Sequence, residues 1–342
     1  MKILYSVQAT GNGHISRAME LLPYLEKWSQ VDIFLSGANS TLILDAPVKY
    51  RSRGLSLFYT CNGTLDHWKL AKNFTPFRIM KEVRDLPVEK YDLILNDFEC
   101  ITSLACAYKK VPSVHFGHQA SFLSPLVPRP DKRNNMGEWI LKNYARGTQS
   151  VGLHFENYDD FIVSPVIKEE IVSANPVNHG HITVYLPSYC DPQLLAVFLP
   201  LKDHHFEIFS CQVKEKNRID NVTFIPVNKA GFNKSMISCY GIITGAGFET
   251  PAEGLYLKKK MIAIPIKGQY EQECNAAALK KLGVTTLDKL DDDFKNTFHQ
   301  WVNDPSTPTI AYSHSTDGII DFMMNRCTGL KNAFNPAPGN FL

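Results

Sequence analysis

A strand-to-helix turn at residues 245–253 (GAGFETPAE) has the residue types and spacing to hold an anion. It follows an apolar run, and glycine at such a turn lets a ligand approach the backbone closely. The free N–H groups at the start of the next helix attract a negatively charged group such as a diphosphate. Glu253, three residues beyond Thr250, could reach a ribose diol. A structural interpretation stays open, in which the glycines make a tight turn and Thr250 and Glu253 form a capping pair.

Polar side chains follow the next apolar run, residues 261–266 (MIAIPI). The loop and the first turns of the helix predicted after it carry Gln269, Glu271, Gln272 and Asn275. An amide donates and accepts hydrogen bonds at once, so it suits sugar hydroxyls better than it suits a cation or a metal. Together the two segments predict a sugar site beside a diphosphate site.

A second glycine turn, residues 11–18 (GNGHISRA), follows the first apolar run of the chain. His14 could take a proton from a hydroxyl nucleophile, because an imidazole titrates near neutral pH. Ser16 and Arg17 could hold a phosphate group or cap the helix. Asp97, at the end of a later apolar run, could act as a base or orient one. Purely structural roles stay open for His14 and for Asp97, which could cap the helix that follows it.

Elements that could position these side chains recur along the whole chain, where apolar runs of strand length alternate with helical patterns. In the first half we predict strands at 2–9, 31–37, 91–98 and 111–117, and helices at 16–28 and 99–110. A second series of strands is predicted at 181–187, 205–210, 221–227, 240–246 and 260–266. The alternation predicts an α/β fold of two Rossmann-like domains that face each other across a cleft at the carboxyl ends of their strands.

The expected domain boundary lies between residues 165 and 166, in a connector near 160–170. The first domain is then 1–165 and the second is 166–327, with a helix expected within 308–327. Residues 328–342, which include several Pro and Asn, are expected to form a loosely ordered tail.

Composition argues against several classes of function. The 36 Lys and Arg against 34 Asp and Glu leave a formal net charge of +2, so no nucleic-acid partner is expected. Eight cysteines without CxxC spacing, and no HExxH, argue against a metal site and favour a reducing cytoplasm. The first residues lack a signal-peptide pattern, and no apolar run approaches the ~20 residues that span a bilayer. A dehydrogenase is disfavoured because GxGxxG needs a third glycine where Ser16 stands.

The order of the C-terminal residues resembles that of the GT-B glycosyltransferases, specifically the family 28-like group that includes the enzyme making lipid II from lipid I. The family pattern is a glycine-rich turn, T-x-x-E, a strand ending in Pro, a Gln-containing loop and N-A-x-x-L-x-x-x-G. It is carried here by Gly247, Thr250, Glu253, Pro265, Gln269, Gln272, Asn275, Ala276, Leu279 and Gly283. The likeness covers nearly the whole chain at fold level and is sharp over 241–283 and 8–18.

The resemblance implies a nucleotide-sugar donor site in the second domain. Glu253 would hold the ribose, the 245–250 turn the diphosphate, and Gln269 with Gln272 the sugar hydroxyls. The implied donor set is Ser188, Phe232, Gly245, Ala246, Gly247, Thr250, Glu253, Gln269, Gln272 and Asn275.

Two parts of this donor set depart from the family pattern or rest on weaker likeness. Residues 186–191 (LPSYCD) replace a glycine-rich turn, so Ser188 could meet the phosphate whereas an inward Asp191 would repel it. Phe232 or Ile225 would pack on the nucleobase.

The resemblance also implies an acceptor side in the first domain. Residues 114–122 (VHFGHQASF) partly match the family's H-E-Q-N stretch, but no Glu stands between His118 and Gln119. The implied acceptor-side residues are Asn12, Gly13, His118 and Gln119. The implied catalytic base is His14 or, failing it, Asp97.

The resulting prediction is a hexosyltransferase that moves a sugar from a nucleoside diphosphate sugar, UDP by family default, to a hydroxyl acceptor that is lipid-linked or a glycan. Inversion, no metal and no cofactor are expected, with the leaving diphosphate stabilised by backbone N–H groups. Residues 128–146 interleave basic and apolar side chains, as peripheral contacts with the inner face of a membrane do and as ordinary surface helices also do. A nucleotide-sugar epimerase or hydrolase of the same fold, or a binder without catalysis, stays open as the alternative.

Overall fold

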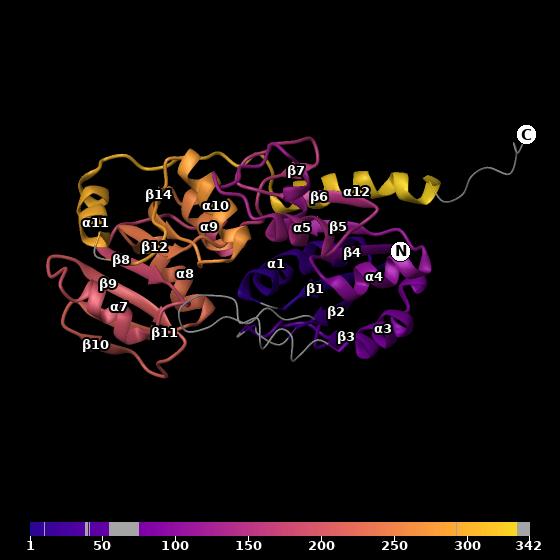
Figure 1. The fold of residues 1–342 in the computed structure, drawn as a ribbon, viewed down its shortest axis with the longest axis horizontal. Coiled ribbons are helices and arrows are strands. Elements are labelled where there is room, and N and C mark those ends of the chain that lie inside the picture. The colour runs from indigo at the N-terminus through magenta and orange to yellow at the C-terminus, as the bar shows by residue number, and fades with distance from the viewer. Residues whose placement is uncertain (10, 38–39, 41, 55–74, 292, 334–342) are drawn as a thin grey trace, which may run out of the picture.

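The protein is described here by a computed structural model that covers residues 1–9, 11–37, 40, 42–54, 75–291 and 293–333, with side chains to residue 327. Within these residues the chain forms two α/β halves that lie side by side (Figure 1). Each half is built on one sheet, with seven strands in the described part of the chain. The predicted α/β class with two Rossmann-like sheets is confirmed.

The first sheet has the strand order β3-β2-β1-β4-β5-β6-β7, and its described strand pairs are parallel. Helices cover both faces of such a sheet, which is why its central strands read as almost unbroken apolar runs. Its strands are β1 (Lys2–Gln8), β2 (Gln30–Ser36), β3 (Val48–Ser52), β4 (Leu93–Asp97), β5 (Val114–Gly117), β6 (Gln149–Leu153) and β7 (Ile162–Val163). Its helices are α1 (Asn12–Trp28), α3 (Pro76–Asp85), α4 (Cys100–Lys109) and α5 (Asn135–Asn143), with 3-10 turns η1 (Val88–Lys90) and η2 (His118–Leu123).

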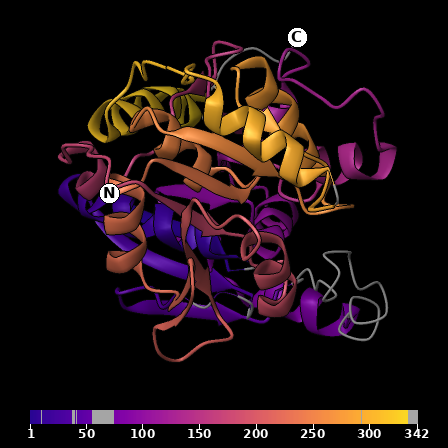
Figure 2. The same ribbon diagram turned by 90° about the vertical axis from the view of Figure 1, so that its left-hand side faces the viewer.

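The second sheet has the order β10-β11-β9-β8-β12-β13-β14, and only the edge strand β10 pairs antiparallel within the described residues. In Figure 2 the elements of this half lie in front of those of the first half. Its strands are β8 (His181–Tyr185), β9 (His205–Ser210), β10 (Asn217–Ile219), β11 (Val222–Pro226), β12 (Gly241–Gly245), β13 (Lys260–Ile264) and β14 (Thr285–Thr286). Its helices are α6 (Glu169–Val172), α7 (Asp191–Phe198), α8 (Lys229–Ser238), α9 (Glu249–Tyr256), α10 (Tyr270–Lys281) and α11 (Phe294–Asn303).

The last helix, α12 (Thr316–Ala333), returns to the first half, where it packs against α1 and β6 (Figure 1). Its buried side chains Ile319, Ile320, Met323 and Cys327 follow helical spacing and join the core of that half. This differs from the predicted division, which assigned residues to 327 to the second domain and 328–342 to a loose tail. The helix extends to Ala333, and residues 334–342 lie outside the described part of the chain.

Helix α1 begins at Asn12, one turn earlier than the predicted Ser16. Its N-cap, Gly11, is extended at φ −164° and ψ 171°. Gly13 and His14 therefore stand in the first turn of a helix rather than in a loop.

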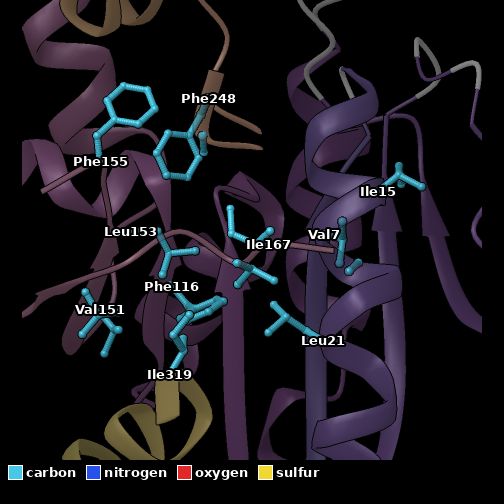
Figure 3. Close-up of a cluster of buried hydrophobic side chains, with 14 of the residues drawn as sticks. Val7, Ile15, Leu21, Phe116, Val151, Leu153, Phe155, Ile167, Phe248 and Ile319 are labelled. Carbon is cyan, nitrogen blue, oxygen red and sulfur yellow. The ribbon is translucent and has the colours of Figure 1, made fainter. Parts of the chain in front are cut away.

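One cluster of buried apolar side chains contains residues of both halves. Figure 3 shows Ile15 of α1 and Phe116 of β5 in the same cluster as Phe248, which precedes α9. The rings of Phe155 and Phe248, one from each half, have their centroids 5.2 Å apart. The two halves therefore share part of their core. Burial of each such ring stabilises the fold by roughly 1.5–3 kcal/mol.

Candidate active site

A cleft of about 690 Å³ lies between the two halves. The first turn of α1 and the turn η2 line it from one side, and the loops that follow β8, β9, β11, β12 and β13 line it from the other. These are the carboxyl ends of parallel strands, where open α/β sheets bind their ligands. The sequence-predicted residues that line it are Asn12, Gly13, His14, His118, Gln119, Ser188, Phe232, Gly247, Thr250, Gln269 and Gln272.

Five other predicted residues lie beneath this lining rather than in it. Asn275 is fully buried and bridges the halves, because its Oδ1 lies 2.7 Å from His118 Nε2 while its Nδ2 donates to the Ala246 carbonyl at 3.1 Å. Gly245 ends β12, where an added Cβ would lie 3.7 Å from Gln272 Oε1. The residues outside the lining are Asp97, Ala246, Glu253 and Asn275, which are buried, and Gly245, which is half-buried.

The two candidate bases form one pair, in which His14 Nδ1 lies 2.8 Å from Asp97 Oδ1. A carboxylate accepts hydrogen bonds only, so the contact with Asp97 favours a ring hydrogen on Nδ1, which leaves Nε2 to accept a proton. Arg17 Nη2 lies 2.9 Å from the same Nδ1 and donates to Asp97 Oδ1 at the shorter distance of 2.7 Å. Burial alone would raise the pKa of Asp97, but Arg17 and His14 beside it lower that pKa well below its usual range. Asp97 is therefore a carboxylate at neutral pH, and His14 lies between it and the cleft.

The helix cap that was an alternative role for Asp97 is made by Glu99 instead. The Glu99 carboxylate accepts from the backbone N–H of Ile101 at 2.9 Å and of Thr102 at 2.6 Å, at the start of α4. Asp97 is left to face α1. The capping alternative for Thr250 and Glu253 is likewise absent, because the N-cap of α9 is Phe248 and has no side-chain cap hydrogen bond.

Arg17 organises the pair, and it stands one helical turn after His14 on α1. Its Nε donates to Asp97 Oδ2 at 3.0 Å and its Nη2 donates to Asp97 Oδ1 at 2.7 Å. Its remaining nitrogen, Nη1, donates to Glu249 Oε1 at the start of α9 in the other half. Glu249 was not among the predicted site residues, although its place directly after GAGF was a signal that it faces the cleft.

Glu253, the predicted ribose ligand, pairs with a lysine from the connector. Lys168 Nζ donates to Glu253 Oε2 at 3.0 Å, and Lys168 lines the cleft whereas Glu253 does not. Burial raises the pKa of Glu253 and Lys168 opposes that effect. Within the described part of the chain, Glu253 Oε1 is buried without a hydrogen-bond partner, which is unusual for a native carboxylate. Lys168 is a site residue that the sequence analysis did not identify.

On the sugar side, polar atoms of both halves meet. Gln119 Nε2 donates to Glu271 Oε1 at 3.0 Å across the cleft. Gln272 Oε1 accepts from the backbone N–H of Ile266 at 3.0 Å. Among the described residues, Gln119 Oε1 and Gln269 Oε1 are buried without hydrogen-bond partners. Both residues line the cleft, so these oxygens could accept from hydroxyl groups of a bound ligand.

Aromatic side chains form one part of the cleft lining. Phe232 lines it with its ring centroid 5.4 Å from that of Tyr185. Ile225, the other residue suggested for the nucleobase, is not in the lining. Asp191 begins α7, and its Oδ1 accepts from Ser210 Oγ at 2.6 Å, so this carboxylate does not line the cleft beside Ser188.

No helix of the described residues is both long enough and apolar enough to cross a bilayer. In the same part of the chain, no cluster of three or more His, Cys, Asp or Glu side chains is placed to bind a metal ion.

The two facing Rossmann-like sheets and the cleft between them form the GT-B architecture. The chain belongs to glycosyl transferase family 1, whose model matches residues 1–303. This confirms the predicted GT-B glycosyltransferase, whereas the finer likeness to family 28 and to the lipid II-forming group stays a prediction. No curated protein matches the chain.

Several solved glycosyltransferases are similar in fold. The glycosyltransferase of kitacinnamycin is 13% identical over 98% of this chain and 99% of its own, with a TM-score of 0.61. Arabidopsis thaliana UGT89C1, complexed with UDP, is 13% identical over 98% of this chain and 96% of its own, with a TM-score of 0.57. VinC, in complex with dTDP, is 12% identical over 97% of this chain and 100% of its own, with a TM-score of 0.55.

Proposed function

We propose that the protein transfers a sugar from a nucleoside diphosphate sugar to a hydroxyl acceptor, with inversion and without a metal ion. The observation that carries the proposal is the His14–Asp97 pair, in which His14 faces the helix starts at 247–250 and 269–272 across one cleft. The UDP bound by UGT89C1 and the dTDP bound by VinC, proteins of similar fold, support a nucleoside diphosphate as the leaving group.

In the proposed step the acceptor oxygen bonds to the anomeric carbon on the face opposite the diphosphate. The bond from that carbon to the diphosphate oxygen breaks, and its electron pair leaves with the diphosphate. His14 Nε2 takes the hydroxyl proton, and Asp97 stabilises the imidazolium that forms. Because Asp97 is buried and ionised, it also holds the ring in the tautomer that the step requires.

The donor would lie along the second half of the cleft. Its diphosphate would meet the N-terminus of α9, where backbone N–H groups lack intrahelical partners. Its base would pack against Phe232, and its ribose would approach the Lys168–Glu253 pair, whose unpartnered Oε1 could accept from a ribose hydroxyl. Gln119, Gln269 and Gln272 would bind hydroxyls of the sugar.

The proposed reaction is tested by product analysis with a panel of UDP- and dTDP-sugars in the presence of EDTA. Proton NMR of the products would show a new glycoside of inverted anomeric configuration if the proposal holds. Isomerised donor, or free sugar at the same rate with and without acceptor, would point to an epimerase or a hydrolase. Bound but unchanged donor would point to a binding protein.

The segment 128–146 supports a second proposal, a peripheral contact with the inner face of an anionic membrane. Met136 and Trp139 of α5 are exposed at 67% and 61%, and the preceding Leu126 at 63%. Lys132 and Arg133 are exposed beside them. Apolar side chains next to exposed cations are the pattern that binds anionic lipid surfaces, and a lipid-linked acceptor would be presented there.

A further inference from the structure

A carboxylate lies between two helix N-termini in the cleft, and it belongs to the protein itself. Glu249 is the first residue of α9, and its Oε1 accepts from Arg17 Nη1. Its other oxygen, Oε2, faces the first turn of α1, where a Cβ added at Gly13 would lie only 3.1 Å away. The two glycine turns of the sequence, far apart along the chain, therefore meet around one anionic group.

This place is built to hold an anion. Each helix N-terminus contributes roughly half a positive charge, and Arg17 adds a guanidinium whose charge is shared with Asp97. The first-turn N–H groups of α9 have no intrahelical acceptors, and its N-cap supplies no side-chain hydrogen bond. Phosphate oxygens bind such helix ends and pair with arginine through charge-assisted hydrogen bonds.

We propose that Glu249 occupies the place of the donor diphosphate in the ligand-free protein, and that Arg17 exchanges this carboxylate for the diphosphate when the donor binds. The inference rests on the proposed function. It adds to that function a cation, Arg17, that binds the leaving group, and a carboxylate, Glu249, that competes with the leaving group for Arg17. Glu249 lines the cleft together with Gly247 and Thr250, so a diphosphate at the start of α9 meets the Glu249 carboxylate. Two anions at one site repel each other, and the side chain must leave.

The exchange leaves the base in place, because Arg17 divides its donors between two partners. Nε and Nη2 bind the Asp97 carboxylate, and only Nη1 binds Glu249. When Nη1 moves to the diphosphate, Asp97 keeps both of its hydrogen bonds from Arg17 and its contact with His14. Arg17 then connects the leaving group directly to the pair that accepts the proton.

The proposal predicts that removing a charge from the site tightens binding. Inorganic pyrophosphate and UDP would be titrated into the wild-type protein and into Glu249→Gln by calorimetry, at low salt and with EDTA. We expect both probes to bind Glu249→Gln roughly tenfold more tightly, a change typical of removing one close like charge. Glu89→Gln, which removes an exposed carboxylate that pairs with Lys109 outside the cleft, is the matched control and should change the pyrophosphate affinity by less than about twofold.

A double-mutant cycle assigns the effect to Arg17. In the Arg17→Lys background, Glu249→Gln should tighten pyrophosphate binding by less than about threefold, because the exchange partner is altered and the two changes are coupled. Unchanged or weaker pyrophosphate binding by Glu249→Gln would overturn the inference, even if UDP binds the wild type. Tighter pyrophosphate binding without any UDP binding would support the anion site and contradict the nucleotide donor instead.

Discussion

His14 Nδ1 and Asp97 Oδ1 lie 2.8 Å apart, although they come from the start of α1 and the end of β4. The parallel pairing of β1 with β4 brings these two strand ends together at one edge of the sheet. The contact with a carboxylate favours a ring hydrogen on Nδ1 and leaves Nε2 for the substrate. The catalytic proposal depends on this pair, and the predictions below test its parts separately.

Replacing His14 by Gln should lower turnover by a factor of about 10²–10⁴, because general-base assistance is lost while the donor loops are untouched. Donor affinity should stay within about twofold, since His14 faces the acceptor in the proposed geometry. Initial rates and calorimetric titration of UDP on the same preparation separate the two effects. Turnover equal to that of the wild type would remove His14 from the base role.

Acid should destabilise the fold partly through Asp97. Its pKa is lower in the folded protein than in the unfolded chain, so its ionised form stabilises the fold. That contribution is fully present above the unfolded pKa, about 4, and is lost as the pH falls below it. Urea unfolding between about pH 6 and pH 3 should show a smaller loss of unfolding free energy in Asp97→Asn than in the wild type. Parallel curves for the two proteins would contradict the assigned ion pair.

Glu253→Gln should distinguish the ribose from the diphosphate. The variant keeps the volume of the side chain but removes the acceptor charge, so UDP binding should weaken by roughly tenfold, as for loss of a charged hydrogen bond. Pyrophosphate has no ribose, and its affinity should be unchanged. Calorimetry with both ligands makes the comparison. Equal weakening for both ligands would mean that Glu253 acts through Lys168 or through the fold rather than on the ribose.

Binding to vesicles tests the surface at 128–146. Wild-type protein should sediment with phosphatidylserine-containing vesicles and not with purely zwitterionic ones, and added salt should weaken the association. The double variant Met136→Ser with Trp139→Ser removes exposed apolar contact area and should reduce binding by at least about tenfold. Phe77→Ser, an exposed aromatic on α3 at 92% exposure, is the matched control. Equal binding by all three proteins would exclude this face of α5.

Much of the fold follows from local patterns, and the exceptions have identifiable physical causes. The strands β8, β9, β11, β12 and β13 lie where apolar runs predicted them, because buried parallel strands have little choice of residue type. Helix α12 packs against α1 and β6 of the first half, and the sequence did not indicate this contact, since the helical spacing of Ile319 and Met323 shows that one face is buried but not what covers it. The element that covers this face is determined by packing between distant parts of the chain.

Some residues of the candidate site were also predicted from local patterns, and others were not. Glycine turns and amide loops were recognisable from spacing, and most of the residues they named line the cleft. Glu249 and Lys168 were not recognised, because a carboxylate at a diphosphate site and a lysine in a connector read as ordinary surface charges. Their roles depend on contacts with distant parts of the chain, because Glu249 pairs with Arg17 and Lys168 pairs with Glu253.

The central claim is that the cleft binds a nucleoside diphosphate between the two halves. Its most direct test is calorimetric titration of UDP and dTDP into the wild-type protein in the presence of EDTA. The account predicts micromolar binding of at least one of them at one site per chain, weakened in Glu253→Gln. Absence of binding by both nucleotides, in protein whose folding is verified by a cooperative thermal transition, would contradict it.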